Sequence, residues 1–284
     1  MRFVALVISI CLLAACGPKA VAQAPGKPSP TASASPSARP VTPASHIFVI
    51  VMENRSYAQV IDSPYIAQLA ARYGVATNYH SVSSPSLPNY LALTSGDTWG
   101  INDNEFHRLP AGGLGAQLSD AGIEWRAYME SMTNGCLNNT PLYAVKHNPF
   151  AYYGGGCPPQ VVPLTHFADD MAGPAPRFVW ITPDLCNDGH DCSNAAADNW
   201  LSQMVPIIQA LNAWQDNGLL VITWDEGVGN DDQVLTLMIR PKSTPQRSAS
   251  PYDHYSLLAT IEDQFRLPRL GQAAQATPMN DLLR

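Results

Sequence analysis

The sequence has little charge, and basic residues are in the minority. Only 14% of its 284 residues are charged, and 23 acidic residues outnumber 16 Lys and Arg residues. The resulting net charge of −7 argues against a nucleic-acid-binding protein with a broad basic face. The 25 Pro and 19 Gly residues are scattered along the chain, which excludes a coiled coil. After the N-terminal segment, no apolar run reaches the roughly 18 residues needed to span a membrane.

The first segment has the layout of an export signal. Arg2 is followed by an apolar run from Phe3 to Ala15, as in a secretory signal peptide. The run ends in Leu-Ala-Ala-Cys, which resembles the lipobox of bacterial lipoproteins, whose cysteine is lipidated. We therefore predict a signal peptide over residues 1–15 and a lipid anchor on Cys16. The protein would be an exported cell-envelope lipoprotein, or one released outside the cell. The alternative is an ordinary signal peptide in which the cysteine has no role.

A segment rich in Pro, Ala and Ser comes next. Residues 17–45 contain no aromatic and no acidic side chain, so they cannot bury enough apolar surface to fold. We predict a lipidated cysteine with a disordered tether over residues 16–45, followed by one domain over residues 46–284. The hydrophobic content of 46% is sufficient for a sizeable core in that domain.

Four cysteines lie in the predicted domain, and none of them forms a Cys-x-x-Cys pair. An even number of cysteines in an exported chain indicates two disulfides, whereas the missing Cys-x-x-Cys spacing disfavours a zinc site. Of the three possible connectivities, local pairing is favoured: Cys136 with Cys157, and Cys186 with Cys192.

Continuous apolar runs alternate with helical patterns along the domain. The predicted strands cover 46–52, 123–129, 177–182, 219–224 and 234–240. The predicted helices cover 64–74, 87–95, 195–217 and 254–265, with a possible kink at Pro206. This alternation predicts the α/β class, with a mainly parallel central sheet and helices on both faces. Residues 101–163, rich in Asn, Gly, Pro and Tyr, are predicted to form a long insertion over one edge of the sheet.

Acidic residues follow three of the predicted strands. Glu53 and Asn54 follow the first, the segment 184–191 follows the third, and Asp225 and Glu226 follow the fourth. Sites in open parallel sheets form outside the carboxyl ends of the strands, so these clusters would converge on one crevice. Their oxygen ligands suit a hard divalent cation. Acids after strands are also ordinary turn formers, and only the coincidence of three favours a site.

A serine-rich stretch precedes the predicted helix 87–95. Ser86 there would meet unpaired backbone N–H groups and the positive end of the helix dipole, which together attract a phosphate. The alternative is that Ser86 only caps the helix, with Pro88 in the first turn.

Six motifs in a fixed order carry a resemblance to a known family. The sequence resembles the phosphoesterase family, which includes bacterial phospholipases C and acid phosphatases, within the alkaline-phosphatase-like superfamily. Its strongest likeness is to secreted acid phosphatases, including one that acts on phosphatidylinositol 3-phosphate. The motifs are MENRSY (52–57), PSLPNYLALTSG (85–96), KHNPF (146–150), NDGHD (187–191), TWDEG (223–227) and DHYSLLATIED (253–263).

The resemblance implies a role for each matched residue. Ser86 is the expected nucleophile, and Asn89 is expected to contact a phosphoryl oxygen. His190 is expected to protonate the leaving oxygen or to position the attacking water. A divalent cation of unknown identity is expected on four matched residues: Glu53, Asn54, Asp225 and Glu226.

Further matched residues have less definite roles. Asp188 and His254 would supply a second metal site or acid–base groups, and Lys146 and His147 would bind substrate phosphate. Relatives usually carry His where this chain has Ser84, and no His follows the TWDEG motif, so one metal is expected rather than two. Each histidine also has a structural interpretation: a surface residue, a neighbour of a helix cap, or a ring stacked on aromatic side chains.

Together these features predict an exported, metal-assisted phosphatase of the acid phosphatase type. It would hydrolyse phosphate monoesters through a phosphoserine, acting on a phosphorylated small molecule or a phospholipid headgroup. A phospholipase C or other phosphodiesterase on the same scaffold is the first alternative. A non-catalytic surface lipoprotein that binds a ligand or partner is the second.

Overall fold

The computed structural model describes residues 42–284. The predicted signal peptide over residues 1–15, Cys16 and most of the tether lie outside the described residues, so these assignments stay predictions. The last residues of the predicted tether are described, and they contact the domain. For example, the backbone N–H of Ala44 donates to Gln264 Oε1 at 2.8 Å. The folded part therefore begins a few residues earlier than predicted.

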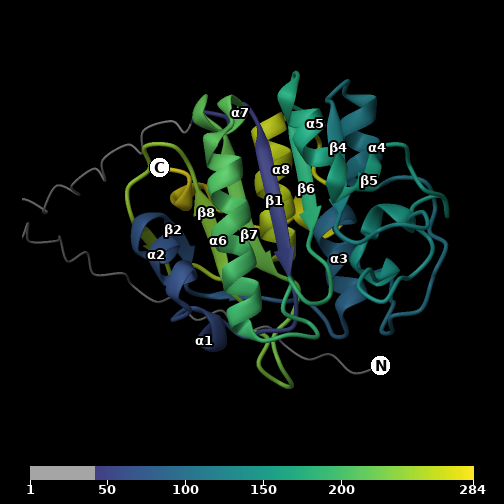
Figure 1. Cartoon of the computed structure of the whole chain (residues 1–284), viewed down its shortest axis with the longest axis horizontal. Helices are drawn as coiled ribbons and strands as arrows, with labels where there is room; N and C mark the ends of the chain where they lie inside the picture. Colours follow the sequence, from purple (N-terminus) through teal and green to yellow (C-terminus); the bar gives the residue numbers. More distant parts are fainter. Residues whose placement is uncertain (1–41) are drawn as a thin grey trace, which may run out of the picture. The chain divides into compact units, whose positions relative to one another are not determined.

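A mainly parallel sheet of eight strands forms the centre of the described domain (Figure 1). The strand order is β5-β4-β6-β1-β7-β8-β2-β9, and only β8 runs antiparallel to its neighbours. Its strands are β1 (Ile47–Met52), β2 (Gly74–Ala76), β4 (Trp125–Met129), β5 (Val161–Pro163), β6 (Phe178–Thr182), β7 (Leu219–Trp224), β8 (Thr236–Ile239) and β9 (Gln246–Ser248). A second, two-stranded parallel sheet pairs β3 (Tyr79–His80) with β10 (Tyr252–Asp253).

Helices cover both faces of the large sheet, which confirms the predicted fold class. Helix α6 crosses in front of the sheet in Figure 1 and α8 lies behind it. Helix α2 packs on α6, and α3 packs on α8. The α-helices are α1 (Tyr57–Val60), α2 (Pro64–Arg72), α3 (Ser86–Ser95), α4 (Gly113–Asp120), α5 (Phe167–Ala172), α6 (Asn194–Ala210), α7 (Asn212–Gln215) and α8 (His254–Phe265). Short 3₁₀ turns are η1 (Val145–His147), η2 (Pro149–Ala151), η3 (Leu164–His166), η4 (Gly271–Ala274) and η5 (Asn280–Leu282). Within residues 42–284, no helix combines the length and apolar character that a bilayer crossing requires.

The core of the sheet explains why the site lies where it does. Strands β1, β6 and β7 are buried along their whole length, because their continuous apolar runs face helices on both sides. Polar side chains are therefore confined to the residues just after each strand. Helix α3 begins at Ser86 and ends where Gly96 adopts a left-handed conformation with φ of 70°, as is common at helix ends.

The structure corrects two of the predicted segments. Residues 101–163 are not wholly an insertion: the strand predicted over 123–129 is confirmed as β4, and the same segment also supplies α4 and the edge strand β5. The helix predicted over 195–217 is two helices, α6 and α7. They are separated at Leu211, whose extended backbone (φ −71°, ψ 139°) interrupts the helical pattern, whereas Pro206 lies inside α6.

Candidate active site

The register of β1 and β7 brings two of the predicted acidic clusters together. Met52 and Trp224 are paired at the carboxyl ends of these strands, so Glu53 and Asp225 follow side by side. The N–H of Asp225 donates to Met52 O at 2.9 Å, and the N–H of Asn54 donates to Asp225 Oδ1 at 3.0 Å. Asn54 adopts a left-handed conformation with φ of 47°, which asparagine tolerates better than most residues. The backbone therefore fixes both acids at the same point of the sheet edge.

The third cluster lies on a loop that a disulfide closes after β6. Cys186 and Cys192 are bonded, and the loop between them carries Asp188 and His190. The N–H of Glu53 donates to Asp188 O at 3.0 Å, which attaches the loop to the end of β1. All three clusters consequently meet.

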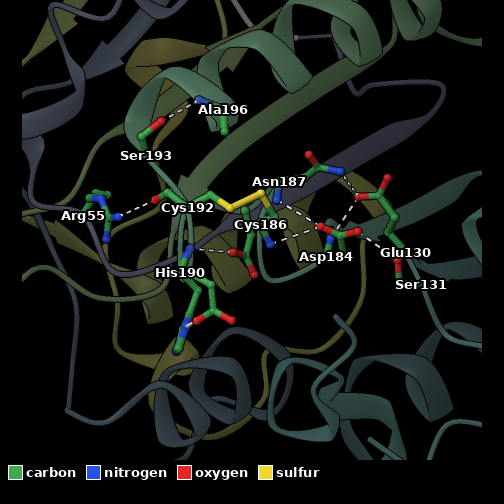
Figure 2. Close-up of a disulfide and its surroundings, with 12 residues drawn as sticks. Arg55, Glu130, Ser131, Asp184, Cys186, Asn187, His190, Cys192, Ser193 and Ala196 are labelled. Atoms are coloured by element: carbon green, nitrogen blue, oxygen red, sulfur yellow. Dashed lines mark hydrogen bonds and ion pairs between the residues drawn. A yellow bond between two sulfur atoms is a disulfide. The ribbon is translucent and has the colours of Figure 1, made fainter. Parts of the chain in front are cut away.

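Figure 2 shows how both ends of this loop are held. Asp184 Oδ1 accepts hydrogen bonds from the N–H groups of Cys186 (3.1 Å) and Asn187 (3.0 Å). On the other side, Arg55 Nη2 donates to Cys192 O at 2.9 Å. The second pair, Cys136 and Cys157, is also bonded and lies in the segment 101–163. Both disulfides are thus the local pairs that the cysteine spacing favours.

Ser86 lies among the carboxylates at the first turn of α3. Its Oγ is 3.2 Å from Glu53 Oε2 and 3.2 Å from Glu226 Oε1. Ser86 is 1% exposed and Glu226 is 8% exposed. One turn later on the same helix, the Tyr90 hydroxyl donates a hydrogen bond to Glu53 Oε1. The predicted nucleophile is therefore within hydrogen-bonding distance of two of the predicted metal-binding acids, Glu53 and Glu226.

Burial and mutual repulsion raise the pKa values of these carboxyl groups and so disfavour their ionised forms. Burial raises the pKa of Glu53 well above its usual value, and the charges of Asp225 and Asp188 raise it further. Burial also raises the pKa of Asp188 to about 8 and that of Asp225 to about 7. Acids crowded without water are costly unless a cation neutralises them. The cluster is therefore a place where a cation would be strongly favoured.

Buried polar atoms without hydrogen-bond partners also indicate a cation site. Asp188 Oδ2, Asp225 Oδ2 and His147 Nε2 are buried and have no hydrogen-bond partner within residues 42–284. One ligand atom each from Glu53, His147 and His190 also lie within 4.8 Å of one another. Carboxylate oxygens and imidazole nitrogens together suit divalent metal ions. These donors suit a divalent cation; of the predicted ligands only Glu53 belongs to this group of three, and His147 and His190 are additional candidate ligands.

His147 lies deeper than a substrate-binding residue would. It is 1% exposed, its Nε2 approaches Glu53 Oε1 to 3.2 Å without the geometry of a hydrogen bond, and its ring stacks on Tyr90 at a centroid distance of 5.4 Å. Burial lowers its pKa well below the usual value, which favours the neutral form of the ring beside the acids. A neutral imidazole can bind a metal ion but carries no positive charge with which to bind phosphate. The ring on which it stacks, Tyr90, also belongs to the site, because its hydroxyl donates to Glu53.

Lys146 and His190 form the outer edge of the site. Lys146 Nζ donates to His190 Nε2 at 3.1 Å, and His190 Nδ1 donates to Asp191 Oδ1 at 2.6 Å. The N–H of His190 donates to Asp188 Oδ1 at 2.7 Å. A cationic amine and an oriented imidazole are thereby placed next to the buried acids, where a phosphoryl group would need them.

Asn89 does not face a phosphoryl position, contrary to the prediction from the resemblance. Its Oδ1 accepts hydrogen bonds from the N–H groups of Val82 and Ser83, both at 3.0 Å. Its Nδ2 donates to Ser83 O at 2.8 Å and Pro85 O at 3.3 Å. All of its amide groups are used to hold the loop before Ser86, so Asn89 is a positioning residue.

His254 is likewise committed to internal hydrogen bonds. Its Nε2 donates to the backbone carbonyl of Asp225 at 2.6 Å, so Nδ1 accepts from the Tyr79 hydroxyl at 2.9 Å. Burial lowers its pKa to about 4, although Asp225 and Asp253 raise it. Neither nitrogen is free for a metal or for proton transfer. His254 supports the Asp225 backbone instead of forming the predicted second site.

Two functional contacts were missed from the sequence. Tyr90, which binds Glu53, follows Ser86 by four residues and so shares its helix face, a spacing that could have indicated it. Arg55 donates to Asn54 O at 2.7 Å as well as to the disulfide loop, and its position next to the Glu-Asn pair was the available signal.

The architecture and its acid-lined site define an alkaline-phosphatase-like phosphoesterase fold. A protein of the alkaline phosphatase superfamily from Vibrio parahaemolyticus has a similar structure, with a TM-score of 0.61 and 10% identity, covering 85% of this chain and 74% of that one. A phosphonate monoester hydrolase from Silicibacter pomeroyi has a TM-score of 0.56 and 11% identity, covering 84% of this chain and 76% of that one. At this identity these neighbours establish the fold alone.

The sequence comparisons give the family itself. The model of the Phosphoesterase family matches residues 59–247. The phosphatidylinositol-3-phosphatase of Mycobacterium tuberculosis is 31% identical over 84% of this chain and 82% of its own length. A phosphate-repressible acid phosphatase of Penicillium chrysogenum is 28% identical over 84% of this chain but only 65% of its own length. The chain belongs to the phosphoesterase family, which confirms the resemblance seen in its motifs.

Proposed function

We propose that this protein is an exported, metal-assisted phosphatase that hydrolyses phosphate monoesters through a phosphoserine on Ser86. The predicted enzyme class, a phosphoric monoester hydrolase, agrees with the names of the relatives. The observation that carries the proposal is the buried Ser86 hydroxyl, 3.2 Å from both Glu53 and Glu226. A hydroxyl between two carboxylates at a helix start has a proton acceptor and a phosphate-attracting dipole at the same point.

A divalent cation is part of the proposal. Glu53, Asn54, Asp225 and Glu226 would hold it, and His147 is a further candidate because its Nε2 is unpartnered within residues 42–284. When bound, such a cation neutralises phosphoryl charge and lowers the pKa of a neighbouring hydroxyl. Without it, an anionic ester would meet a group of acids and be repelled.

The chain supplies the groups for both halves of the reaction. Ser86 Oγ forms a bond to phosphorus in line with the leaving oxygen, while its proton passes to a neighbouring carboxylate. The bond between phosphorus and the alcohol oxygen breaks, and that oxygen takes a proton from the Lys146–His190 pair. Water then attacks the phosphoserine and returns a proton to this pair, and Ser86 regains its hydrogen as phosphate leaves.

The monoester preference and the location rest on separate arguments. A domain of about 240 residues leaves little room for the extra domains with which larger phosphodiesterases could bind lipids. Two disulfides and the N-terminal signal and lipobox patterns support export and a lipid anchor. The phosphatidylinositol-3-phosphatase relative makes a phospholipid headgroup a substrate to test beside phosphorylated small molecules.

The test measures release of inorganic phosphate by the full chain, with a panel of divalent cations or a chelator present. The wild type should release phosphate from p-nitrophenyl phosphate, and Ser86→Ala should be slower by at least about a thousandfold. Ser84→Ala, at an exposed serine two residues away, is the matched control and should retain activity. Acid quench and mass spectrometry should find phosphate on Ser86.

Other outcomes separate the alternatives. Hydrolysis of the bis ester or of phosphatidylcholine in preference to the monoester would identify a phosphodiesterase. No release under any cation or pH would support the non-catalytic lipoprotein. A wild-type rate for Ser86→Ala would exclude Ser86 as the nucleophile.

A further inference from the structure

A cavity of about 530 Å³ lies beside the candidate active site. Its volume falls within the range of ligand pockets in proteins. The segment 101–163 supplies the whole lining. The lining includes Asn104, Glu105, Phe106, Leu137, Lys146 and Tyr152.

Two lining residues connect the cavity to the catalytic groups. Asn104 Oδ1 accepts a hydrogen bond at 3.1 Å from the N–H of Leu87, the residue that directly follows Ser86. Lys146 Nζ donates to His190 Nε2 at 3.1 Å. Lining residues of the cavity are therefore bonded to the backbone next to the nucleophile and to the group proposed to protonate the leaving oxygen.

The lining exposes large apolar side chains that the fold does not cover. Phe106 is 47% exposed and Leu137 is 42% exposed. The ring of Phe106 packs against Tyr152 at a centroid distance of 5.0 Å, which leaves its other side open. Exposed apolar groups gathered at a cavity next to a site indicate an apolar ligand.

Charge narrows the choice of ligand. Glu105 contributes a carboxylate to the lining, whereas the single cationic group there, Lys146, already contacts His190. A leaving group with a second negative charge, such as that of a phosphoinositide, would be repelled by Glu105 and would lack a free cation to bind, so we expect it to be a poorer substrate than an uncharged alcohol's ester. A neutral alcohol would meet neither penalty.

We propose that this cavity binds the alcohol portion of the substrate, and that the enzyme prefers phosphate monoesters of neutral, apolar alcohols. The phosphoryl group lies at Ser86 while the apolar chain or ring extends over Phe106 and Leu137. This inference rests on the proposed phosphatase function. It adds a specificity site that the catalytic residues alone do not provide.

The test compares ethyl phosphate with n-hexyl phosphate, whose leaving groups have similar intrinsic reactivity and differ in apolar length. Wild-type kcat/KM for the hexyl ester should exceed that for the ethyl ester by at least about tenfold, because the added methylene groups leave water. In Phe106→Ser and Leu137→Ser this hexyl-to-ethyl ratio should fall toward one. Leu142→Ser changes a leucine of the same segment that is 40% exposed and outside the lining, and it should keep the wild-type ratio.

The outcomes of this experiment separate a failure of the proposed specificity site from a failure of the proposed phosphatase function. Hydrolysis of both esters with no chain-length preference would overturn the inference and leave the phosphatase intact. A preference that Phe106→Ser and Leu137→Ser do not reduce would place the apolar site elsewhere and also overturn it. If the wild type hydrolyses neither alkyl ester and also fails to hydrolyse p-nitrophenyl phosphate, both proposals are refuted. Hydrolysis of p-nitrophenyl phosphate without hydrolysis of the hexyl ester would overturn this inference alone. Circular dichroism and Tm of each variant show whether a loss comes from unfolding.

Discussion

Buried carboxyl groups occur in two very different places in this molecule. At the ends of β1 and β7, Glu53, Asp188 and Asp225 lie close together, and two of their oxygens have no partner within residues 42–284. In α8, no second buried acid lies beside Glu262: its Oε1 accepts a hydrogen bond from the N–H of Leu270 at 2.8 Å, while its Oε2 is buried and also has no partner within residues 42–284. Burial raises the pKa of acids in both places. Burial alone therefore does not identify a cation site, whereas the clustering of several acids does.

Replacing one acid of the cluster should have the largest effect. Asp225→Asn should lower phosphate release by at least about a hundredfold, because the cation would lose a ligand. At about pH 8 without added cation, the variant should nevertheless melt at a higher temperature than the wild type, since one buried anion has been removed. Saturating divalent cation should reverse that order, as measured by Tm with and without chelator.

Asp120→Asn, at an exposed acid that ends α4, is the control for this experiment. It should change neither activity nor the response of Tm to cation. An identical cation-induced rise of Tm in Asp225→Asn and the wild type would exclude Asp225 as a ligand. It would also refute the claim that the clustered acids, unlike the isolated Glu262, bind a cation.

A neutral residue beside the cluster should have the next largest effect. Asn89→Ala removes four hydrogen bonds from the loop 82–85 and should lower kcat by roughly tenfold to a hundredfold, because Ser86 would lose its orientation. KM should change little if Asn89 only positions the loop. A large rise of KM with kcat preserved would instead indicate direct phosphoryl contact. Asn102→Ala, at an exposed asparagine, is the matched control.

The isolated acid should show the smallest effect, and on stability alone. Burial raises the pKa of Glu262 to about 7, above its value in the unfolded chain. Its stabilising contribution is therefore complete at low pH and is lost as pH rises through about 7. Glu262→Gln keeps the acceptor for Leu270 and adds donors toward Gln117, so its Tm should exceed that of the wild type by roughly 2–4 °C at about pH 8.

This advantage should shrink toward about pH 5, where the wild-type carboxyl is largely protonated when folded. Glu124→Gln, at an exposed position, should show no such pH dependence. A Tm difference that is independent of pH, or a response of Glu262→Gln to cation that differs from the wild type, would contradict the assignment of Glu262 to a structural role.

The parts of the fold and site that the sequence predicts well are those with one physical interpretation. The apolar runs that became β1, β6 and β7 are short and bounded by turn-forming residues, which favours strands buried on both faces, and the acids after them then meet at one edge. Strands of two or three residues such as β3 and β5 carry no detectable periodicity, and tertiary pairing alone determines them. The break at Leu211 also has no local signal, because nothing in its sequence stops a helix.

Residue roles are harder to predict than residue proximity. Asn89, His147 and His254 all lie at or next to the site, as the motifs imply. Residue type does not reveal whether an amide faces a ligand or its own loop, or whether an imidazole has a free nitrogen. These properties depend on partners far away in the sequence, such as Tyr79 for His254.

The ring closed by Cys186 and Cys192 has a practical consequence. Asp188 and His190 lie between the two sulfur atoms, so the chain segment that presents them is fixed by a covalent bond that thiols can cut. Protein produced in a reducing cytoplasm would lack this bond, and its loop 186–192 would be less rigid. A low turnover of such protein would then be wrongly attributed to the enzyme itself. Titration of free sulfhydryls should therefore precede any comparison of turnover between batches.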